Sequence, residues 1–169
     1  PDLHRDLLDR DFTLNAMAFP LEAADGVELI DPCDGQGDLQ SGVLRMVGGE
    51  SLANDPLRLL KGIRHAAQLG FEVAAATLEA MRAAVPGLGK VAPERIRQEF
   101  WQILAADDQA RGFALLCDSG AGAALFGARS VKELRQAAPR LNALRGAWRS
   151  LAVVQPAIAG WMEEEVEQG

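Results

Sequence analysis

The sequence predicts a mainly α-helical protein with a short β-containing segment near its N-terminal end. Three observations support this fold class. From Ser51 onward, apolar residues recur at spacings of three and four, as in amphipathic helices. Between residues 27 and 47, short apolar runs alternate with Asp, Gly and Pro, as in short strands joined by turns. The 169 residues are 49% hydrophobic and 24% charged, which describes a globular protein with a real core.

The clearest predicted helix spans residues 54–71. Asn54 or Asp55 can cap its start, Pro56 suits the first helical position, and Gly70 suits its end. At 100° per residue, one side of this helix is an apolar stripe made of Pro56, Leu59, Leu60, Ile63, Ala66 and Ala67.

The opposite side of the same helix carries Asp55, Arg58, Gly62 and His65. A carboxylate and a guanidinium therefore lie one turn apart, and we expect the glycine beside them to leave room for a ligand. The alternative interpretation is a capping aspartate followed by a solvent-exposed arginine.

The N-terminal part is predicted to contain little regular structure. Residues 12–19 form a short helix capped by Asp11 or Thr13, or a strand, and residues 34–37 form a loop. Short strands are expected at 27–30 and 43–47. Two such strands cannot make a stable sheet alone, so we expect them to be the edge of a larger sheet and to favour self-association through this exposed edge.

Further helices are expected after the central one. They are predicted at 74–84, with a break at 86–89, then from Pro93, from Asp107 or Asp108 to Gly120, and twice after residue 130, with divisions near Pro139 and Pro156.

The charge distribution bears on possible partners. A net charge of −7 argues against a protein that grips nucleic acid with its whole surface. A basic stretch is nevertheless present at residues 129–149, where only Glu133 opposes six cations; a solvated helix face is the alternative interpretation. These cations are Arg129, Lys132, Arg135, Arg140, Arg145 and Arg149.

Other features bear on cellular location. No apolar run has membrane-spanning length, and no signal-peptide pattern is found, so no membrane partner is expected. Cys33 and Cys117 have neither metal-ligand nor disulfide spacing, which predicts a cytoplasmic location. Because the first residue is Pro1, we expect the chain to be a piece of a longer protein.

Four blocks at residues 9–18, 29–39, 54–58 and 93–100 resemble, in order and spacing, motifs B, C, D and E of one family. It is the class II tRNA nucleotidyltransferase (CCA-adding) and bacterial poly(A) polymerase family. The resemblance covers about residues 3 to 127. It implies an enzyme that adds nucleotides from CTP and ATP to RNA 3′ ends without a nucleic-acid template.

The family resemblance also implies Mg²⁺, which is held by two carboxylates of a motif A that precedes motif B. No Gly-Ser element followed by an Asp-x-Asp pair of that kind is found in this sequence. We therefore expect the Mg²⁺ ligands to lie outside this chain, the chain to contain no catalytic or metal-binding residue, and the chain alone to be inactive.

Motifs B and D imply the nucleotide-binding residues. Motif B, Arg-Arg-Asp-Phe-Thr in the family, is matched here by Arg10, Asp11 and Asn15, whereas Asp9 replaces the first Arg. The alternative is that Asp11 caps a helix and pairs with Arg10. Motif D, Glu-Asp-x-x-Arg in the family, retains Asp55 and Arg58, whereas Asn54 replaces the Glu. A carboxylate can accept a hydrogen bond from the exocyclic amine of cytosine or adenine. A guanidinium can donate hydrogen bonds to acceptor atoms of the base ring.

Motifs C and E imply supporting roles. Motif C resembles a glycine-containing linker that allows head and neck to move, although Cys33 and Asp34 depart from its pattern; capping is the expected role of Asp31 and Asp38. In motif E, Arg95 and Glu99 lie one turn apart and are expected to hold the neck helices together.

The sequence thus predicts three parts. Residues 1–50 are expected to be the C-terminal part of a catalytic head, 51–127 a helical neck that recognises the base, and 128–169 the start of a helical body. In the body, Arg135, Arg140, Arg145 and Arg149 are the candidate contacts to RNA, with the acceptor end of tRNA as the partner. A poly(A) polymerase, a CC-only or A-only adding enzyme, and a non-catalytic RNA- or protein-binding module are the alternatives.

Overall fold

The computed structural model describes residues 2–20, 29–129, 131–137, 139–140 and 142–143. Most of these residues are helical, and the strands are short. In chain order, the elements are α1 (Leu3–Leu8), the 3-10 helix η1 (Thr13–Asn15), α2 (Gly35–Ser41), β1 (Val43–Leu44), α3 (Ser51–Asn54), α4 (Leu57–Leu69), β2 (Glu72–Val73), α5 (Ala75–Ala84), the 3-10 helix η2 (Val85–Lys90), α6 (Pro93–Ala105), α7 (Gln109–Asp118) and α8 (Ala121–Phe126).

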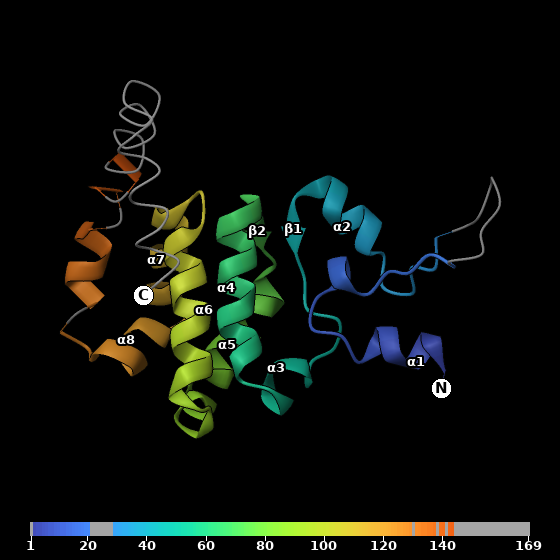
Figure 1. Cartoon of the computed structure of the whole chain (residues 1–169), viewed down its shortest axis with the longest axis horizontal. Coiled ribbons are helices and arrows are strands. Elements are labelled where there is room, and N and C mark those ends of the chain that lie inside the picture. Colours follow the sequence, from blue (N-terminus) through green and yellow to red (C-terminus); the bar gives the residue numbers. More distant parts are fainter. Residues whose placement is uncertain (1, 21–28, 130, 138, 141, 144–169) are drawn as a thin grey trace, which may run out of the picture.

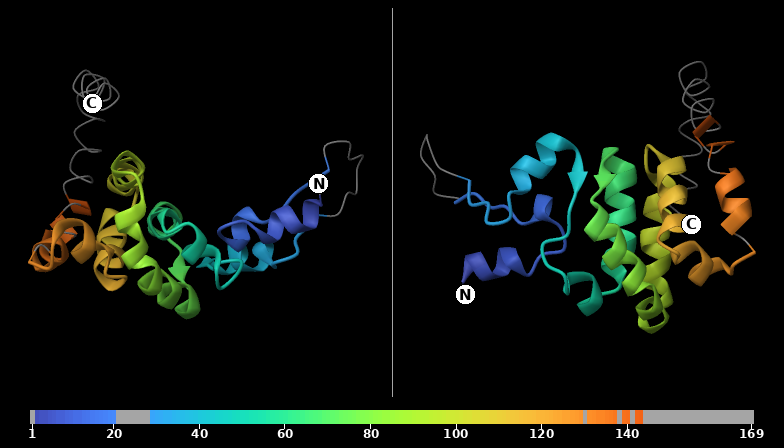
Figure 2. Two further views of the ribbon diagram at one scale, coloured as in Figure 1. Left: turned by 90° about the horizontal axis from the view of Figure 1, so that it is seen from below. Right: turned by 180° about the vertical axis from the view of Figure 1, so that it is seen from behind.

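Helix α4 lies at the centre of the molecule. Helices α6 and α7 pack on one side of it, and the segment from α1 to β1 lies on the other (Figure 1). Views from below and from behind show the same row of elements, with the N-terminal segment at one end and α8 toward the other (Figure 2). The predicted fold class, mainly α with a short β-containing segment, is confirmed.

The predicted central helix is α4, Leu57–Leu69, and the residues just before it form the separate short helix α3. Asp55 has φ −135° and ψ 94°, an extended conformation that separates α3 from α4. The residue before a proline is disfavoured in the α region, so Pro56 explains the division. The predicted end is confirmed, because Gly70 adopts φ +70° and its N–H bonds back to Ala66.

The core is built on the apolar stripe of α4. The side chains of Leu59, Leu60 and Ile63 are fully buried, as predicted. Gly62, which we expected to leave room for a ligand, is instead buried in this core: a Cβ there would lie 2.4 Å from Met81 Cε and 2.7 Å from Phe12 Cζ. The glycine therefore permits close packing of α4 against two side chains, and the expectation of ligand space was wrong.

Residues 34–37, predicted to be a loop, belong partly to helix α2. The Asp31 carboxylate accepts hydrogen bonds from the N–H groups of Gly35 (2.7 Å) and Gln36 (2.8 Å), which confirms the predicted capping role of Asp31. At Gly35 a Cβ would lie 2.2 Å from the Thr13 carbonyl oxygen. This glycine is thus required for close packing within a helix. The linker flexibility that motif C implies stays a prediction.

The strands are shorter than predicted and pair differently. Strand β1 runs parallel to β2, which was not predicted, with Val43 opposite Glu72. Residues that were expected at an open edge have backbone partners: Val47 N–H donates to the Asp11 carbonyl, and Ile30 and Ala18 exchange both hydrogen bonds. Residues 27–28 of the predicted strand lie outside the described residues. Self-association stays a prediction. Ile30 and Val47, however, do not form the open strand edge on which that prediction was based.

The later helices follow the sequence prediction closely. Helices α5, α6 and α7 occupy the predicted ranges, the predicted break at 86–89 is η2, and Asp108 caps α7 by accepting from Arg111 N–H at 3.0 Å. Helix α8 was not predicted. Residues 131–137, 139–140 and 142–143 are helical, and the predicted helices beyond them lie outside the described residues.

The close approach at Gly62 makes a testable prediction. Replacing Gly62 with Val places three carbons where Met81 and the fully buried Phe12 ring already lie. Overpacking of this kind costs about 1–3 kcal/mol, so the free energy of unfolding measured with urea should fall by that amount.

Gly89→Val is the matched control, because nothing lies within 4 Å of a Cβ at that position. Its free energy of unfolding should stay within about 0.5 kcal/mol of the wild-type value. Equal effects of the two substitutions would contradict the packing role of Gly62.

Candidate functional site

Residues from two distant parts of the chain meet at an open pocket of about 420 Å³. One part is the N-terminal segment around η1, and the other is the start of α4. All five predicted nucleotide-contacting side chains line the pocket, together with Lys61, which the sequence analysis did not select. The lining residues are Arg10, Asp11, Asn15, Asp55, Arg58 and Lys61.

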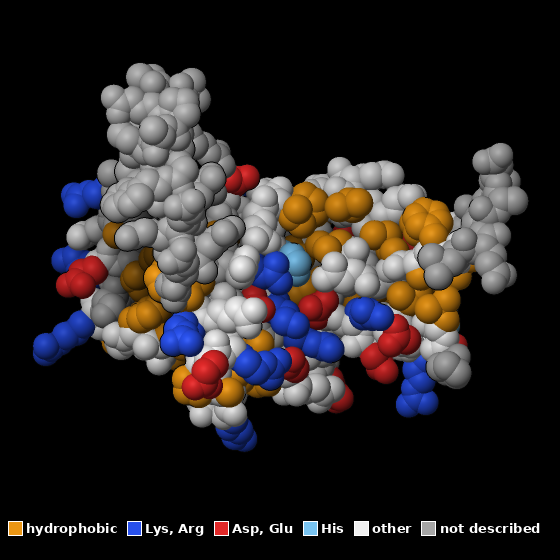
Figure 3. Space-filling view, viewed as in Figure 1, with side chains coloured by type: hydrophobic (Ala, Val, Ile, Leu, Met, Phe, Trp, Pro, Cys, Tyr) orange, Lys and Arg blue, Asp and Glu red, His pale blue; other side chains and the backbone are white. Residues whose placement is uncertain are grey.

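This part of the surface carries both signs of charge. Figure 3 shows Lys and Arg side chains, with acidic side chains between them, across the middle of the face where α4 meets the N-terminal segment. Lys61 lies one turn after Arg58 on α4, so periodicity alone places both cations on one side of the helix. That spacing was the signal that could have identified Lys61.

Arg58 joins α4 to the N-terminal segment. Its Nη1 donates to the Ser51 hydroxyl oxygen (2.7 Å) and to the Arg10 carbonyl (3.4 Å), and its Nη2 donates to the Asp9 carbonyl (3.1 Å). Arg58 is therefore held by three acceptors and is not, as in the alternative interpretation, simply an exposed arginine.

Asp55 contacts both the start of α4 and α6. Its Oδ1 accepts from the Leu57 N–H at 3.2 Å, so the predicted capping contact is present. Its Oδ2 lies 3.6 Å from Nη2 of Arg95. The side chain of Asp55 is about a third exposed, so capping occupies one carboxylate oxygen and leaves the group accessible from the pocket.

Asp11 and Arg10 have partners other than those we expected. Asp11 Oδ1 accepts from Phe12 N–H (2.9 Å) and from the Asn15 amide (3.0 Å), which orients Asn15 at the pocket. Arg10 pairs with Asp6 at 2.6 Å and not with Asp11. The hydrogen bond from Arg10 to Asp6 raises the pKa of the Arg10 guanidinium. The alternative in which Asp11 caps a helix and pairs with Arg10 was therefore wrong.

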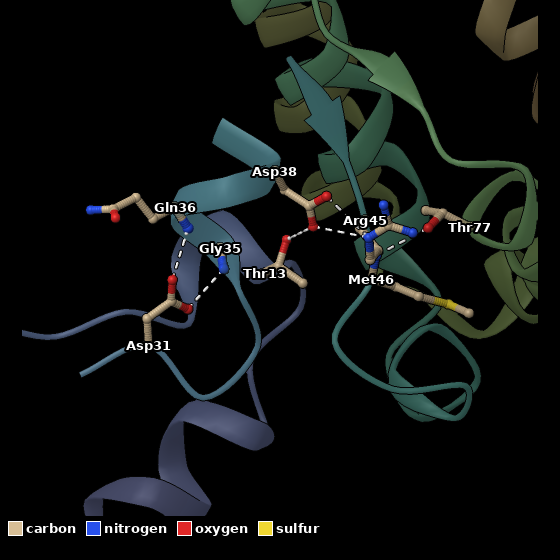
Figure 4. Close-up of polar contacts among 8 residues, drawn as sticks. All are labelled: Thr13, Asp31, Gly35, Gln36, Asp38, Arg45, Met46 and Thr77. Carbon is tan, nitrogen blue, oxygen red and sulfur yellow. Dashed lines mark hydrogen bonds and ion pairs between the residues drawn. The ribbon is translucent and has the colours of Figure 1, made fainter. Parts of the chain in front are cut away.

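A buried polar network supports the N-terminal side of the pocket (Figure 4). Asp38 was expected to act as a cap, but it instead accepts from the Thr13 hydroxyl (2.8 Å) and from Nε of Arg45 (3.0 Å). Thr13 and Asp38 are 2% and 7% exposed, so each needs its partner. Met46 N–H donates to the buried Thr77 hydroxyl, which fixes residues 43–47 to α5. Together these contacts hold η1 in place.

The predicted role of motif E is confirmed. Glu99 of α6 accepts from Nε of Arg64 of α4 at 2.8 Å, and both side chains are largely buried, at 13% and 20% exposure. Arg95 of the same helix pairs with Asp55 at 3.6 Å. Arg95 and Glu99 thus link α6 to the start and to the middle of α4.

His65 lies next to this ion pair on α4. Its ring contacts Phe12 edge-on, with the ring centres 5.9 Å apart. Burial lowers the pKa of His65, and the positive charge of Arg64 lowers it further, whereas Asp11 and Glu99 act in the opposite direction. His65 thus favours its neutral form, partly buried between α4 and the N-terminal segment.

The predicted RNA contacts are described only in part. Arg135 is half-exposed and pairs with Asp118 at 2.6 Å, and Arg140 is exposed. Arg145 and Arg149 lie outside the described residues. The Asn142 side chain accepts from Ala110 N–H (3.0 Å) and donates to Asp108 (2.9 Å), which fastens this segment to the start of α7.

Within the described part of the chain, no group of three or more His, Cys, Asp or Glu side chains is arranged to hold a metal ion. That the Mg²⁺ ligands implied by the resemblance lie outside this chain stays a prediction. None of the described helices has both the length and the apolar character needed to cross a bilayer.

Two family models match the chain in order. Residues 1–45 match the poly(A) polymerase head domain, and residues 70–134 match the probable RNA- and SrmB-binding site of polymerase A. Together the two matches cover more than half of the chain. The chain belongs to the tRNA nucleotidyltransferase and poly(A) polymerase family. This assignment confirms the resemblance seen in motifs B to E.

Known members of this nucleotidyltransferase family are similar to the chain in both sequence and structure. A CC-adding tRNA nucleotidyltransferase of Halalkalibacterium halodurans is 40% identical over 116 residues, which are 68% of this chain and 30% of that protein. The Bacillus stearothermophilus CCA-adding enzyme in complex with CTP superposes with a TM-score of 0.75 at 32% identity, over 83% of this chain and 36% of that one.

A third relative is the Thermotoga maritima CCA-adding enzyme complexed with tRNA. It gives a TM-score of 0.69 at 32% identity and covers 75% of this chain and 31% of that chain. The chain thus spans about a third of the length of these family members.

The lowered pKa of His65 predicts a pH dependence of stability. A group whose folded pKa lies below its unfolded pKa binds its proton more readily in the unfolded chain. The free energy of unfolding should therefore fall as the pH drops below the unfolded value of about 6.5. His65→Gln, which does not titrate, should lose less stability than the wild type between pH 7.5 and 5.5.

Urea unfolding of both proteins at a series of pH values measures this difference. The carboxylates that titrate at lower pH are common to both, so they cancel in the comparison. Parallel curves for wild type and His65→Gln would contradict a partly buried His65 with a lowered pKa.

Proposed function

We propose that the pocket at the start of α4 binds the nucleotide of a template-independent nucleotidyltransferase that adds CTP- and ATP-derived nucleotides to tRNA 3′ ends. One observation carries the proposal: Asp55 and Arg58 of motif D face the same pocket as Arg10, Asp11 and Asn15 of motif B. These residues are far apart in sequence, and packing against α4 brings them together.

The proposed division of labour follows from the chemistry of the side chains. The Asp55 carboxylate accepts a hydrogen bond from the exocyclic amine that cytosine and adenine carry. Arg58 donates hydrogen bonds to acceptor atoms of the base ring. Uracil presents a carbonyl oxygen where cytosine presents the amine, so the carboxylate disfavours it. Arg10 and Lys61 supply positive charge for the phosphates, and Asn15, held by Asp11, faces the sugar.

The RNA is proposed to bind at the end of the helical neck and along the body that follows it. The match to a probable RNA-binding region covers residues 70–134, most of them in the neck, and ends beside the half-exposed Arg135. The exposed Arg140 follows shortly after it. We assign residues 1–50 to the head, 51–127 to the neck and 128–169 to the body, with Arg135, Arg140, Arg145 and Arg149 as contacts to the tRNA acceptor end. The proposed location is the cytoplasm.

A bacterial poly(A) polymerase is the second candidate, because both matching family models are named after that enzyme. In either case Mg²⁺ would supply charge neutralisation for phosphoryl transfer, and its ligands are proposed to lie outside this chain. That the chain alone lacks polymerase activity stays a prediction.

Base recognition is tested by two substitutions in the chain. Asn caps helices about as well as Asp, so Asp55→Asn should keep the fold while weakening the preference for CTP over UTP. Arg58→Ala should also weaken it, because loss of a good bidentate contact costs about 1–3 kcal/mol of discrimination. Titration of CTP and UTP into the ¹⁵N-labelled proteins measures both affinities.

Asp34→Asn is the matched control for the loss of one carboxylate charge. Asp34 is exposed, does not line the pocket, and has a left-handed φ of 56° that Asn tolerates. It should leave the CTP preference unchanged. If the Asp55→Asn protein had wild-type affinity and selectivity, Asp55 would act only as a helix cap and its proposed role in base recognition would be contradicted.

A further inference from the structure

Ser51 is a residue outside the motif matches that touches both sides of the pocket. It is the first residue of α3, seven positions before Arg58, and it is half-buried. Its hydroxyl accepts from Nη1 of Arg58 at 2.7 Å and lies 3.3 Å from the Arg10 carbonyl, to which it donates. One hydroxyl thus bridges the guanidinium of motif D and the main chain of motif B.

The hydrogen bonds of Arg58 show what this bridge does. A guanidinium has five N–H donors in one plane. Three of them are directed to the Ser51 hydroxyl, the Arg10 carbonyl and the Asp9 carbonyl. The two that are left, on Nε and Nη2, are available to a base, and the three acceptors fix the plane in which they point.

The three acceptors differ in what they are attached to. Two are carbonyls of the N-terminal segment, whereas the Ser51 hydroxyl belongs to the helix that directly precedes α4. Nη1 shares its two hydrogens between Ser51 and the longer contact to Arg10. Loss of the hydroxyl therefore removes the shortest contact of the guanidinium and lets its plane turn toward the carbonyls.

We propose that Ser51 is a positioning residue for base selection, which acts by orienting the Arg58 guanidinium. This inference rests on the proposed function of the pocket. Ser51 is not among the residues that line the pocket, and its hydroxyl contacts Arg58 and Arg10 instead. Its effect is expected in the selectivity between CTP and UTP and not in the overall fold.

The test compares Ser51→Thr with Ser51→Val. These two side chains have nearly the same shape and both are β-branched, but only Thr keeps the hydroxyl. Loss of one hydrogen bond corresponds to about a two- to ten-fold change in an equilibrium constant. Ser51→Val should lower the ratio of CTP to UTP affinity by that factor, whereas Ser51→Thr should retain it.

Ser51→Ala is a second variant that should match Ser51→Val, since Ala favours the helix and removes the same hydroxyl. Ser41→Ala is the control: Ser41 is exposed at the end of α2 and does not line the pocket. Its affinity ratio should equal that of the wild type. Titration of the ¹⁵N-labelled chain with each nucleotide measures the ratio, and the spectra report the fold.

The outcomes separate this inference from the proposed function. A wild-type chain that binds CTP no better than UTP overturns the proposed function, and the role of Ser51 with it. A wild-type chain with a clear CTP preference that Ser51→Val and Ser51→Thr both retain, or both lose equally, overturns the role of the hydroxyl alone. A preference kept by Thr and lost by Val supports it.

Discussion

The close approach of α4 to Phe12 at Gly62 is the constraint on which the pocket depends. A Cβ on Gly62 would lie 2.7 Å from the Phe12 ring, so any larger residue would push the N-terminal segment away from the helix. Because Phe12 is fully buried there, the main chain just before it lies within reach of Arg58. A packing contact in the core thereby sets the position of polar groups at the surface.

The pocket side chains are oriented before any ligand binds. The guanidinium of Arg58 is fixed by three acceptors, the Asp55 carboxylate by Leu57 N–H and Arg95, and the Asn15 amide by Asp11. Orientation in advance reduces the entropy lost on binding and sharpens discrimination between similar ligands. Capping and base recognition by Asp55 are compatible, since the cap uses one oxygen of the carboxylate.

Local sequence signals predicted much of the fold and of the candidate site. Helix caps and apolar periodicity identified α4 to α7, and motif order selected five pocket residues, because these signals depend on neighbours in the chain. The errors at Gly62, at α2 and at Asp38 share a different origin. Each depends on contacts with Met81 or Thr13, which are distant in sequence and which periodicity and spacing therefore do not reveal.

A crystal structure of the chain with bound CTP tests the central claim most directly. The account predicts the cytosine amine within hydrogen-bond distance of an Asp55 carboxylate oxygen, and a ring acceptor facing the two donors that Arg58 has left. The Ser51 and main-chain contacts of Arg58 should persist in that complex. CTP bound elsewhere, or in this pocket with its base turned away from Asp55 and Arg58, would contradict the account.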